Sequence, residues 1–349
     1  MTFRLGDFEI GTDVRPFIIA EMSGNHNRSL DRALALVDAA AATGAQALKL
    51  QTYTADTITL DVRGGAFEIS DTASPWTGRN LHDLYKQAFT PWEWHKPIME
   101  RARAQGIACF SSPFDETAVD FLDELGVPAY KIASFENNHL PLIRKVAATG
   151  KPVIISTGMA SLTELDEAVT AARSAGCKHL VLLKCTSTYP ATPTDTNVLT
   201  IPHLREMFGC EVGLSDHTMG VGVAVAAVAH GATVVEKHFT LARADGGVDS
   251  AFSLEPAEMA ALVVETERAW QSLGHVAYGP TEAEKKSLVF RRSIYVAEDM
   301  KAGDRFTARN LRIVRPGNGL HPRHYEELIG RAVSRDARRG EPFSWDLLG

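Results

Sequence analysis

The chain has few cysteines, and their spacing excludes several classes of protein. Only four of its 349 residues are cysteines, with no CxxC pair among them: Cys109, Cys177, Cys185 and Cys210. A disulfide framework and a zinc knuckle are therefore not indicated. Cys109 and Cys185 stand in apolar runs, where a thiol behaves as a small hydrophobic group. We expect both to be buried and the protein to be reduced.

Long hydrophobic runs are also missing. No apolar stretch approaches the roughly 20 residues that a membrane helix needs. The first residues, Met-Thr-Phe-Arg-Leu-Gly-Asp, lack the apolar core of a signal peptide. We therefore expect a cytoplasmic protein that does not bind a membrane.

Positive charge is scarce overall but abundant in the last part of the chain. The net charge is −7, yet the part from Leu288 onward has twelve Lys or Arg against eight Asp or Glu, a charge of +4, and residues 1–287 carry −11. The acidic total, without an interleaved basic and aromatic stripe, argues against nucleic-acid binding. The basic tail either attracts an anionic substrate to the rest of the protein or is a solvated arginine-rich surface.

Eight short apolar runs occupy the first two-thirds of the chain, and each ends in polar residues. These residues are, in order, Glu21; Lys49 and Gln51; Ser111 and Ser112; Lys131 and Ser134; Ser156; Lys184 and Ser187; Ser215 and His217; Glu236 and His238. Continuous apolar runs are typical of parallel strands buried on both faces. Eight of them, alternating with helices, predict an α/β fold, a (β/α)8 TIM barrel whose active site lies at the carboxyl ends of its strands.

The remaining sequence predicts the domain organisation. We expect a barrel domain at 1–274, a linker at 275–289 and a small second domain at 290–349. A Gly-Asp turn within 3–10 predicts a hairpin below the barrel. Two S/T-x-x-E capping boxes, Thr90–Glu93 and Ser161–Glu164, predict helix starts, and Pro256 begins a long helix that ends near Leu273.

Two further segments are unusual. The segment 61–76 has a Gly-Gly pair and no helical period, and it is longer than an ordinary connection, so it is either a lid over the site or a disordered excursion. We favour the lid. In the tail, Gly303–Phe306 with Leu311 is echoed 37 positions later by Gly340–Phe343 with Leu348. Two such copies indicate a small pseudo-symmetric domain.

The residues at the strand ends suit an anionic substrate. Lys49 and Lys131 follow the second and fourth runs, so their ammonium groups are expected to converge. Hydroxyl donors at the same edge come from Ser112, Ser134, Ser156, Ser187 and Ser215. Because charge-assisted hydrogen bonds are about twice as strong as neutral ones, this set suits a small dianion such as a phosphate ester. Each serine alone could instead cap a helix or turn, and a Schiff-base role for either lysine stays open.

His217 and His238 end neighbouring strands and could together bind a metal ion. Two imidazoles with room for water and substrate make an open divalent-metal site. Asp216 precedes one histidine and Lys237 the other, while Glu21 ends the strand next to that of His238 in a closed barrel. Glu21 and Asp249 could act as base or hold the metal's water. Hydrogen-bonded core histidines, and a loop-capping role for Asp249, are the alternatives.

The combined motifs resemble the sialic acid synthase family, and most closely its pseudaminic acid branch. The matching stretches span nearly the whole chain: Glu21–Asn27, Lys49–Tyr53, Thr90–His95, Phe110–Phe114, Tyr130–Ser134, Ser156–Met159, Lys184–Ser187, Gly213–Thr218, Glu236–Phe239, Phe252–Pro256 and Arg315–Gly319. The last stretch resembles the family's antifreeze-like (SAF) domain, which is the fold expected for 290–349.

This resemblance implies condensation of phosphoenolpyruvate with an acyclic amino-sugar aldehyde, giving a nine-carbon sugar acid and phosphate. It implies a divalent cation (Mn, Mg or Co) on His217 and His238. Candidate catalytic residues are Glu21, Lys49, Lys131, Asp249 and the two histidines. Phosphoenolpyruvate contacts are expected at Lys49, Ser112, Lys131, Ser134, Ser156, Ser187 and Ser215, and sugar contacts at Asn25, Gln51, Asn80, Tyr189, Asp249 and Arg315. Arg315 matches a mobile arginine that enters the partner's barrel, so a domain-swapped homodimer is expected.

Departures from the commoner N-acetylneuraminate pattern favour the pseudaminic branch. Ser23 and Arg28 replace two glycines of that pattern, and Ser187 replaces an asparagine. The implied sugar is 2,4-diacetamido-2,4,6-trideoxy-L-altrose. Alternatives are the same reaction giving N-acetylneuraminate or legionaminate, a Schiff-base aldolase, and an ice- or carbohydrate-binding module on an inert barrel.

Overall fold

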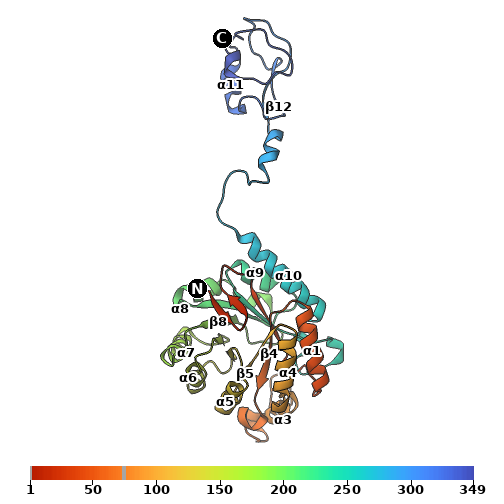
Figure 1. Ribbon diagram of the computed structural model, residues 1–349, viewed down its shortest axis with the longest axis vertical. Helices are drawn as coiled ribbons and strands as arrows, with labels where there is room; N and C mark the ends of the chain where they lie inside the picture. Colours follow the sequence, from red (N-terminus) through yellow and green to blue (C-terminus); the bar gives the residue numbers. More distant parts are fainter. Residues whose placement is uncertain (1, 73–75) are drawn as a thin grey trace. The chain divides into compact units, whose positions relative to one another are not determined.

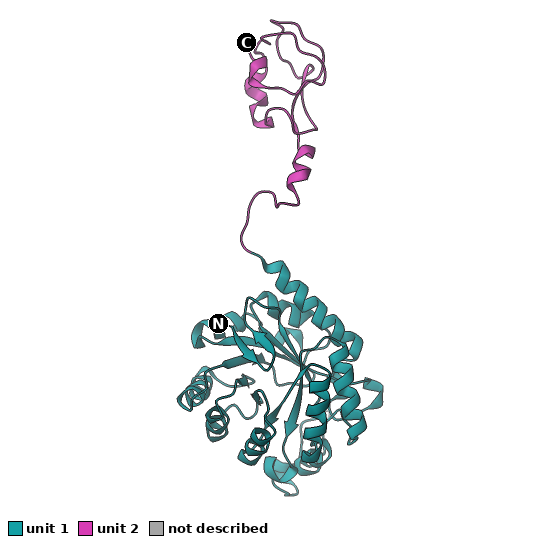
Figure 2. Ribbon diagram, viewed as in Figure 1, with its two compact units in different colours: residues 1–274 teal, residues 275–349 magenta. Residues whose placement is uncertain are grey.

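The computed structural model describes residues 2–72 and 76–349 and contains two compact units, Met1–Gly274 and His275–Gly349 (Figures 1 and 2). Each unit is described by itself. Within the described residues, no helix combines the length and the apolar character that a membrane crossing requires.

The first unit is a closed barrel of eight parallel strands, as the sequence predicts (Figure 1). Around the barrel the strands follow the order β10-β3-β4-β5-β6-β7-β8-β9, so β10 closes on β3. Their bounds are β3 Phe17–Glu21, β4 Ala47–Thr52, β5 Ala108–Pro113, β6 Tyr130–Ile132, β7 Val153–Ser156, β8 Leu180–Cys185, β9 Glu211–Asp216 and β10 Val234–His238. Almost every strand residue is buried, because helices cover the outside and side chains fill the inside.

Helices follow the strands and pack on the outside of the barrel. They are α1 Leu30–Ala42, α2 Ala55–Ile58, α3 Leu81–Ala88, α4 Trp92–Ala104, α5 Glu116–Glu124, α6 Leu140–Ala148, α7 Leu162–Ser174, α8 Thr200–Phe208, α9 Gly222–Ala229 and α10 Pro256–Leu273. Short 3-10 turns lie at Gly65–Phe67, Pro193–Asp195, Arg243–Asp245 and Ser250–Phe252. The predicted long helix from Pro256 is α10.

One of the two predicted capping boxes forms and the other does not. Ser161 and Glu164 cap α7 reciprocally. The prediction for Thr90 is wrong, since α4 begins at Trp92 with Pro91 before it and no side-chain cap. The Thr90 hydroxyl is instead buried within 3.3 Å of His26 Nε2.

The predicted hairpin is present at the amino-terminal end of the barrel strands. Strands β1 Phe3–Leu5 and β2 Phe8–Ile10 pair antiparallel. Phe3 stacks on His179, with ring centroids 4.9 Å apart, and His179 directly precedes β8. The hairpin therefore closes the end of the barrel opposite to the polar strand ends.

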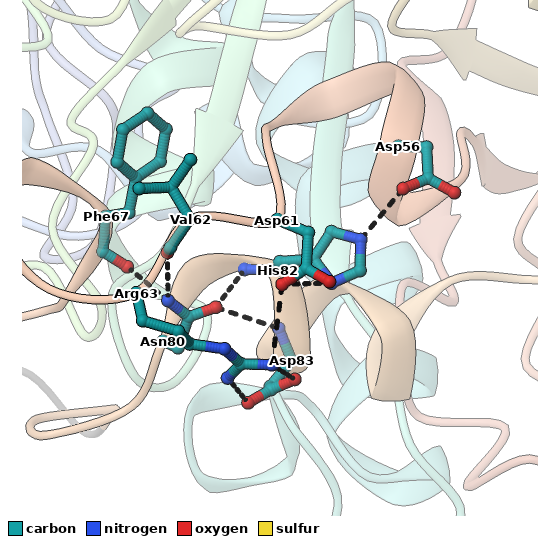
Figure 3. Close-up of polar contacts among 8 residues, drawn as sticks. All are labelled: Asp56, Asp61, Val62, Arg63, Phe67, Asn80, His82 and Asp83. Carbon is teal, nitrogen blue, oxygen red and sulfur yellow. Dashed lines mark hydrogen bonds and ion pairs between the residues drawn. The ribbon is translucent and has the colours of Figure 1, made fainter.

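The described part of the segment 61–76 folds back onto α3; residues 73–75 lie outside the described residues. Figure 3 shows how α3 holds it. Asn80 Nδ2 donates to the carbonyl oxygens of Val62 and Phe67 at 2.8 and 3.2 Å, and Arg63 pairs with Asp83. Beside them, His82 Nε2 lies 2.9 Å from Asp56 Oδ1. The lid role stays a prediction.

The second unit is a small domain of short strands and turns with its own core. Strands β11 Ser293–Val296 and β12 Leu311–Val314 pair antiparallel, and the only α-helix in its residues is α11 Tyr325–Leu328. Its 3-10 turns are Lys285–Phe290, Pro322–His324 and Trp345–Leu347. The two echoed segments place Phe306 and Phe343 edge to face in that core, with ring centroids 5.1 Å apart.

Candidate active site

Two buried lysines lie close together where the barrel strands end. Lys49 on β4 places its Nζ 2.8 Å from Glu21 Oε2 and 3.2 Å from Ser112 Oγ. Lys131 on β6 places its Nζ 3.4 Å from Glu236 Oε1, and Lys49 Nζ is 3.6 Å from the same atom. The two ammonium groups converge as the sequence suggests, and Glu236 joins them.

Burial and charge act against each other in this cluster. Burial would lower the pKa of Lys49, but the carboxylates of Glu21 and Glu236 outweigh it and the pKa is raised. For Lys131 burial dominates and the pKa is lowered. Burial would raise the pKa of Glu236, yet Lys131 and Lys49 hold it below its usual value. The cluster therefore keeps positive charge in a place that excludes water.

Two of the five predicted serines contact this cluster, and the other three lie at or just beyond the ends of β6, β7 and β8. Ser215 Oγ donates to Glu236 Oε1 at 3.1 Å, and Ser112 accepts from Lys49. Ser187 Oγ donates to Ser134 Oγ at 2.8 Å. Ser156 Oγ is buried and has no hydrogen-bond partner within residues 2–72 and 76–349. Hydroxyl groups in these positions can bind phosphate or carboxylate oxygens.

Glu21 ends β3 beside the lysines, and Gln51 Nε2 donates to its Oε1 at 2.9 Å. Burial raises the pKa of Glu21 to about 7 despite the opposing charge of Lys49. A carboxyl group that titrates near neutral pH can accept or release a proton during a reaction.

Sequence reasoning assigned no role to three groups that the structure brings to this edge. Burial raises the pKa of Glu136 to about 7, against the charge of Lys131, and its Oε2 is buried without a partner in the described chain. Glu236 could have been found, because residues two apart on a strand share a face and His238 was already singled out. Cys185 is buried as predicted, but it is more than a hydrophobic group: burial would raise the pKa of its thiol, and His217 lowers it to about 7.

The two histidines face each other with ring centroids 5.4 Å apart. His217 Nδ1 lies 2.8 Å from the carbonyl oxygen of Thr186. Since a carbonyl only accepts, Nδ1 carries a proton. Burial would lower the pKa of His217, but the contact with Cys185 outweighs burial and raises it. Burial, with the nearby positive charges, lowers the pKa of His238 well below its usual value, so this ring is neutral.

These two rings suit a metal site that keeps open coordination positions. His238 Nδ1 is buried without a hydrogen-bond partner in the described residues, and Asp249 Oδ2 lies 3.9 Å from it. The part of the chain that the structure describes holds no group of three or more His, Cys, Asp or Glu side chains arranged for a metal. Two imidazoles that bind a metal ion in their neutral form would therefore leave its other positions to water and substrate.

Asp249 is held next to the histidines by the loop that follows β3. Ser23 Oγ donates a short hydrogen bond to Asp249 Oδ2. Asn25 Nδ2 donates to Phe239 O at 2.9 Å and Ser253 Oγ at 2.8 Å, while Asn25 Oδ1 stays without a partner in the described residues. Burial raises the pKa of Asp249, against the lowering effect of Ser23.

Aromatic rings cover the histidine side of the site. Tyr189 lies 4.4 Å from His217 and 5.3 Å from Phe252, measured between ring centroids. Trp76, at the end of the 61–76 segment, lies 6.0 Å from Tyr189 and donates from Nε1 to Val248 O at 3.2 Å. The segment therefore reaches the edge of the site.

One of the predicted sugar-binding residues, Asn80, has a different role in the structure. Asn80 uses its amide locally: Nδ2 donates to the segment 61–68, and Oδ1 accepts from the amides of His82 and Asp83 to cap α3. These contacts support a structural role (Figure 3). Arg315 belongs to the second unit, where it lines a cavity of about 440 Å³ together with Arg291, Arg292 and His321.

Comparison with known proteins gives matches along both units. Residues 36–278 match the model of the NeuB family, and residues 291–349 match the SAF domain. The chain is 44% identical to a pseudaminic acid synthase of Campylobacter jejuni, over 97% of each protein. It is 34% identical to an N,N'-diacetyllegionaminic acid synthase of the same species, over 94% of this chain and 98% of that protein.

A solved structure matches the fold as well. The N-acetylneuraminic acid synthetase of Leptospira borgpetersenii, crystallised with citrate, has a TM-score of 0.72 and 33% identity. The match covers 82% of this chain and 95% of that one.

Proposed function

We propose that this chain, which belongs to the NeuB family, condenses phosphoenolpyruvate with the aldehyde form of 2,4-diacetamido-2,4,6-trideoxy-L-altrose and water, giving pseudaminic acid and phosphate. The observation that carries the proposal is the near full-length similarity to a pseudaminic acid synthase, which exceeds the similarity to the legionaminic acid synthase of the same species. The geometry of the strand ends supports it.

Lys49 and Lys131 hold phosphoenolpyruvate in this proposal. Their ammonium groups bind its carboxylate and phosphate, and the hydroxyls of Ser112, Ser134, Ser156, Ser187 and Ser215 bind the remaining oxygens. The support is that both lysines are buried within 3.6 Å of one carboxylate oxygen. An anion bound there is held by strong charge-assisted hydrogen bonds.

The sugar lies on the other side, between the histidines and the loops after β3 and β10. Asp249, Asn25, Gln51 and Tyr189 supply contacts to its hydroxyl and amide groups. Holding both reactants in contact converts an encounter in solution into a reaction within one complex, an effect of up to roughly 7–11 kcal/mol.

The reaction joins C3 of the enol to the aldehyde carbon. When a divalent cation is bound by His217 and His238, it supplies Lewis-acid polarisation of the aldehyde oxygen. Bond formation leaves positive charge at C2 and negative charge on the former aldehyde oxygen. A water molecule captures C2, and the proton that it releases balances the proton taken up by that oxygen. The proton of that water passes to a carboxylate, for which Glu21 and Glu136 are the candidates because each titrates near pH 7. The C2–O bond to phosphate then breaks and phosphate leaves.

We also propose that the protein works as a homodimer in which Arg315 of one subunit closes the site of the other. Support comes from the uneven charge of the chain, +4 from Leu288 onward and −11 before it. Opposite charges favour the association of the two parts.

The test is product identification. The purified enzyme is incubated with phosphoenolpyruvate, Mn²⁺ and one of three sugars: the diacetamido-trideoxy-altrose, the precursor of legionaminate, or N-acetylmannosamine. Mass spectrometry should detect the nine-carbon acid and release of phosphate with the altrose far faster than with the others. Efficient turnover of either other sugar instead would overturn the assigned substrate.

A metal-binding measurement accompanies it. Calorimetric titration with Mn²⁺ should show a site that is lost in His238→Ala, while the circular dichroism of the variant stays unchanged. Unchanged Mn²⁺ affinity would remove His238 from the ligands.

Borohydride reduction with pyruvate tests the alternative of a Schiff-base aldolase. It should leave both lysines unmodified; trapping of pyruvate on Lys131 would instead support the aldolase.

A further inference from the structure

Ser23 stands in a backbone conformation that suits glycine. Its φ is 48°, in the left-handed region, and the residue is buried. L-residues with a Cβ pay conformational energy there, and a residue that persists in this region usually has a side chain that the surroundings require. Ser23 is the second residue after Glu21, in the loop between β3 and α1.

The Ser23 side chain contacts one functional group, the carboxylate of Asp249. Its hydroxyl donates to Asp249 Oδ2. Two neighbours of Ser23 connect the loop after β3 with the loop after β10 at other points. Asn25 bonds Ser253, whose hydroxyl donates to the backbone of Asp249 at 2.7 Å. Asn27 Nδ2 donates to Gly246 O at 3.0 Å. Asn25 and Ser253 therefore fix the backbone at Asp249, while Asn27 bonds the loop only at the exposed Gly246. The carboxylate itself is held by the Ser23 hydroxyl and by the backbone amide of Gly24.

The direction of that carboxylate is not fixed by its loop alone. Asp249 Oδ2 lies 3.9 Å from His238 Nδ1, which has no hydrogen-bond partner among the described residues. A buried carboxylate that loses its hydroxyl donor turns toward the nearest nitrogen that can donate a hydrogen to it. His238 would be that group, and Asp249 would then face the histidine.

We propose that Ser23 is a positioning residue: its hydroxyl keeps the Asp249 carboxylate directed at the amino sugar, so that Ser23 sets the affinity for the sugar and leaves that for phosphoenolpyruvate unaffected. This inference rests on the proposed function, in which Asp249 contacts the sugar. Ser23 itself does not touch the reacting atoms.

Ser23→Gly and Asn27→Gly make a matched pair for the test. Both residues have φ of 48°, so glycine relieves the backbone equally at each. Only Ser23→Gly removes a donor to Asp249. We expect this variant to raise KM for the sugar about tenfold or more, as for a lost hydrogen bond to a charged group, with KM for phosphoenolpyruvate within twofold. Asn27→Gly should change both constants less than twofold, and neither variant should lower Tm.

A double-mutant cycle decides whether Ser23 acts through Asp249. Adding Ser23→Ala to Asp249→Ala should cause no further loss of kcat/KM for the sugar. If Asp249→Ala turns over too slowly, the cycle can use binding affinities instead. Calorimetry then measures the affinity of the wild type, the two single variants and the double variant for the unreactive reduced sugar in the presence of phosphoenolpyruvate. Independent, multiplying effects of the two substitutions would overturn the inference, as would equal effects of Ser23→Gly on both substrates.

Failure of the proposed function gives a different result. If the unmodified enzyme prefers another amino sugar, the assigned substrate is wrong, but the cycle run with that sugar still decides the role of Ser23.

Discussion

Burial sets the ionisation of two carboxyl groups at the strand ends, and charge sets that of a third. Glu21 and Glu136 both reach a pKa of about 7, although lysines stand near each of them. Glu236, which faces both lysines, stays below its usual value. Carboxyl groups whose pKa values differ within one site can have different roles. A group that titrates near pH 7 can carry a proton, and one that stays ionised provides a fixed negative charge.

Glu136 should make the protein less stable as the pH rises. Its pKa in the folded state is about 7 against an ordinary 4.5, so the folded protein holds a proton that the unfolded chain has released. The cost is absent below about pH 4.5, grows as pH rises to 7 and then stays constant. It amounts to about 3 kcal/mol, at 1.36 kcal/mol per pKa unit. Urea unfolding of the protein and of Glu136→Gln between pH 5 and 8 should show the variant gaining stability relative to the wild type.

An exposed carboxyl group provides the control for this titration. Glu124 ends α5 on the surface, and Glu124→Gln measured in the same way gives the baseline for removing a carboxyl group from this protein. A flat difference for Glu136→Gln would mean that Glu136 is ionised in the folded protein at all these values.

The sequence predicts the lysines and serines of the site better than its carboxylates. Lys49 and Lys131 directly continue apolar runs, so their place at the strand ends follows from strand length alone. Glu136 does not follow an apolar run directly. It stands four residues beyond the end of β6, in a loop whose sequence does not indicate that its side chain is buried. Its role as a buried carboxyl group becomes visible only when the neighbouring loops are in place.

At the scale of elements, strands β9 and β10 are tied together on the outer face of the barrel. Residues alternate between faces along a strand, so His238 and Glu236 point to the site while Lys237 points away from it. Lys237 Nζ bonds Asp216 Oδ2 at 2.7 Å and the carbonyl oxygens of Thr218 and Gly220 at 2.6 and 2.9 Å. In the sequence, Asp216 and Lys237 directly precede the two histidines. In the structure, their side chains pair with each other on the opposite face of the strands.

Breaking this buried pair should weaken the barrel strongly. Lys237→Met leaves the Asp216 carboxylate buried without its cation, a change that typically costs about 3–5 kcal/mol. Lys145→Met, which breaks the exposed pair with Asp120, should cost about 1 kcal/mol or less. Urea unfolding of both variants measures the difference. Similar losses in the two would show that the Lys237 pair is not a principal tie between β9 and β10.

Strand and helix positions followed from the sequence more reliably than helix caps. Apolar runs and their spacing are set by the barrel core, which tolerates little variation. A capping box needs only two residues at the right spacing, and at Thr90 the hydroxyl lies instead beside His26 inside the protein. Tertiary contacts decide such cases, and a short local pattern does not contain them.

At the scale of the whole molecule, a cluster of arginines lies in the second unit and the lysine cluster lies in the barrel. Arg315, Arg291 and Arg292 line one cavity of the second unit. The basic character of the tail is visible in the sequence, and so is its division from the barrel. The sequence does not reveal which barrel of the proposed dimer Arg315 reaches, because the connection between the two domains fixes no direction.

Mixing two inactive variants should restore activity if the sites are shared between subunits. In the proposed mechanism, His238→Ala should disable the barrel and Arg315→Ala should disable the contribution of the second unit. In a dimer containing one of each, one of the two sites combines an intact barrel with an intact Arg315 from the other subunit. After subunit exchange in dilute denaturant, such mixed dimers should recover about a quarter of the wild-type rate, because half of the dimers are mixed and each has one complete site. Each variant treated alone should stay inactive, and light scattering should report a dimer. A mixture no more active than its separate parts would place Arg315 at its own subunit's barrel or outside the reaction.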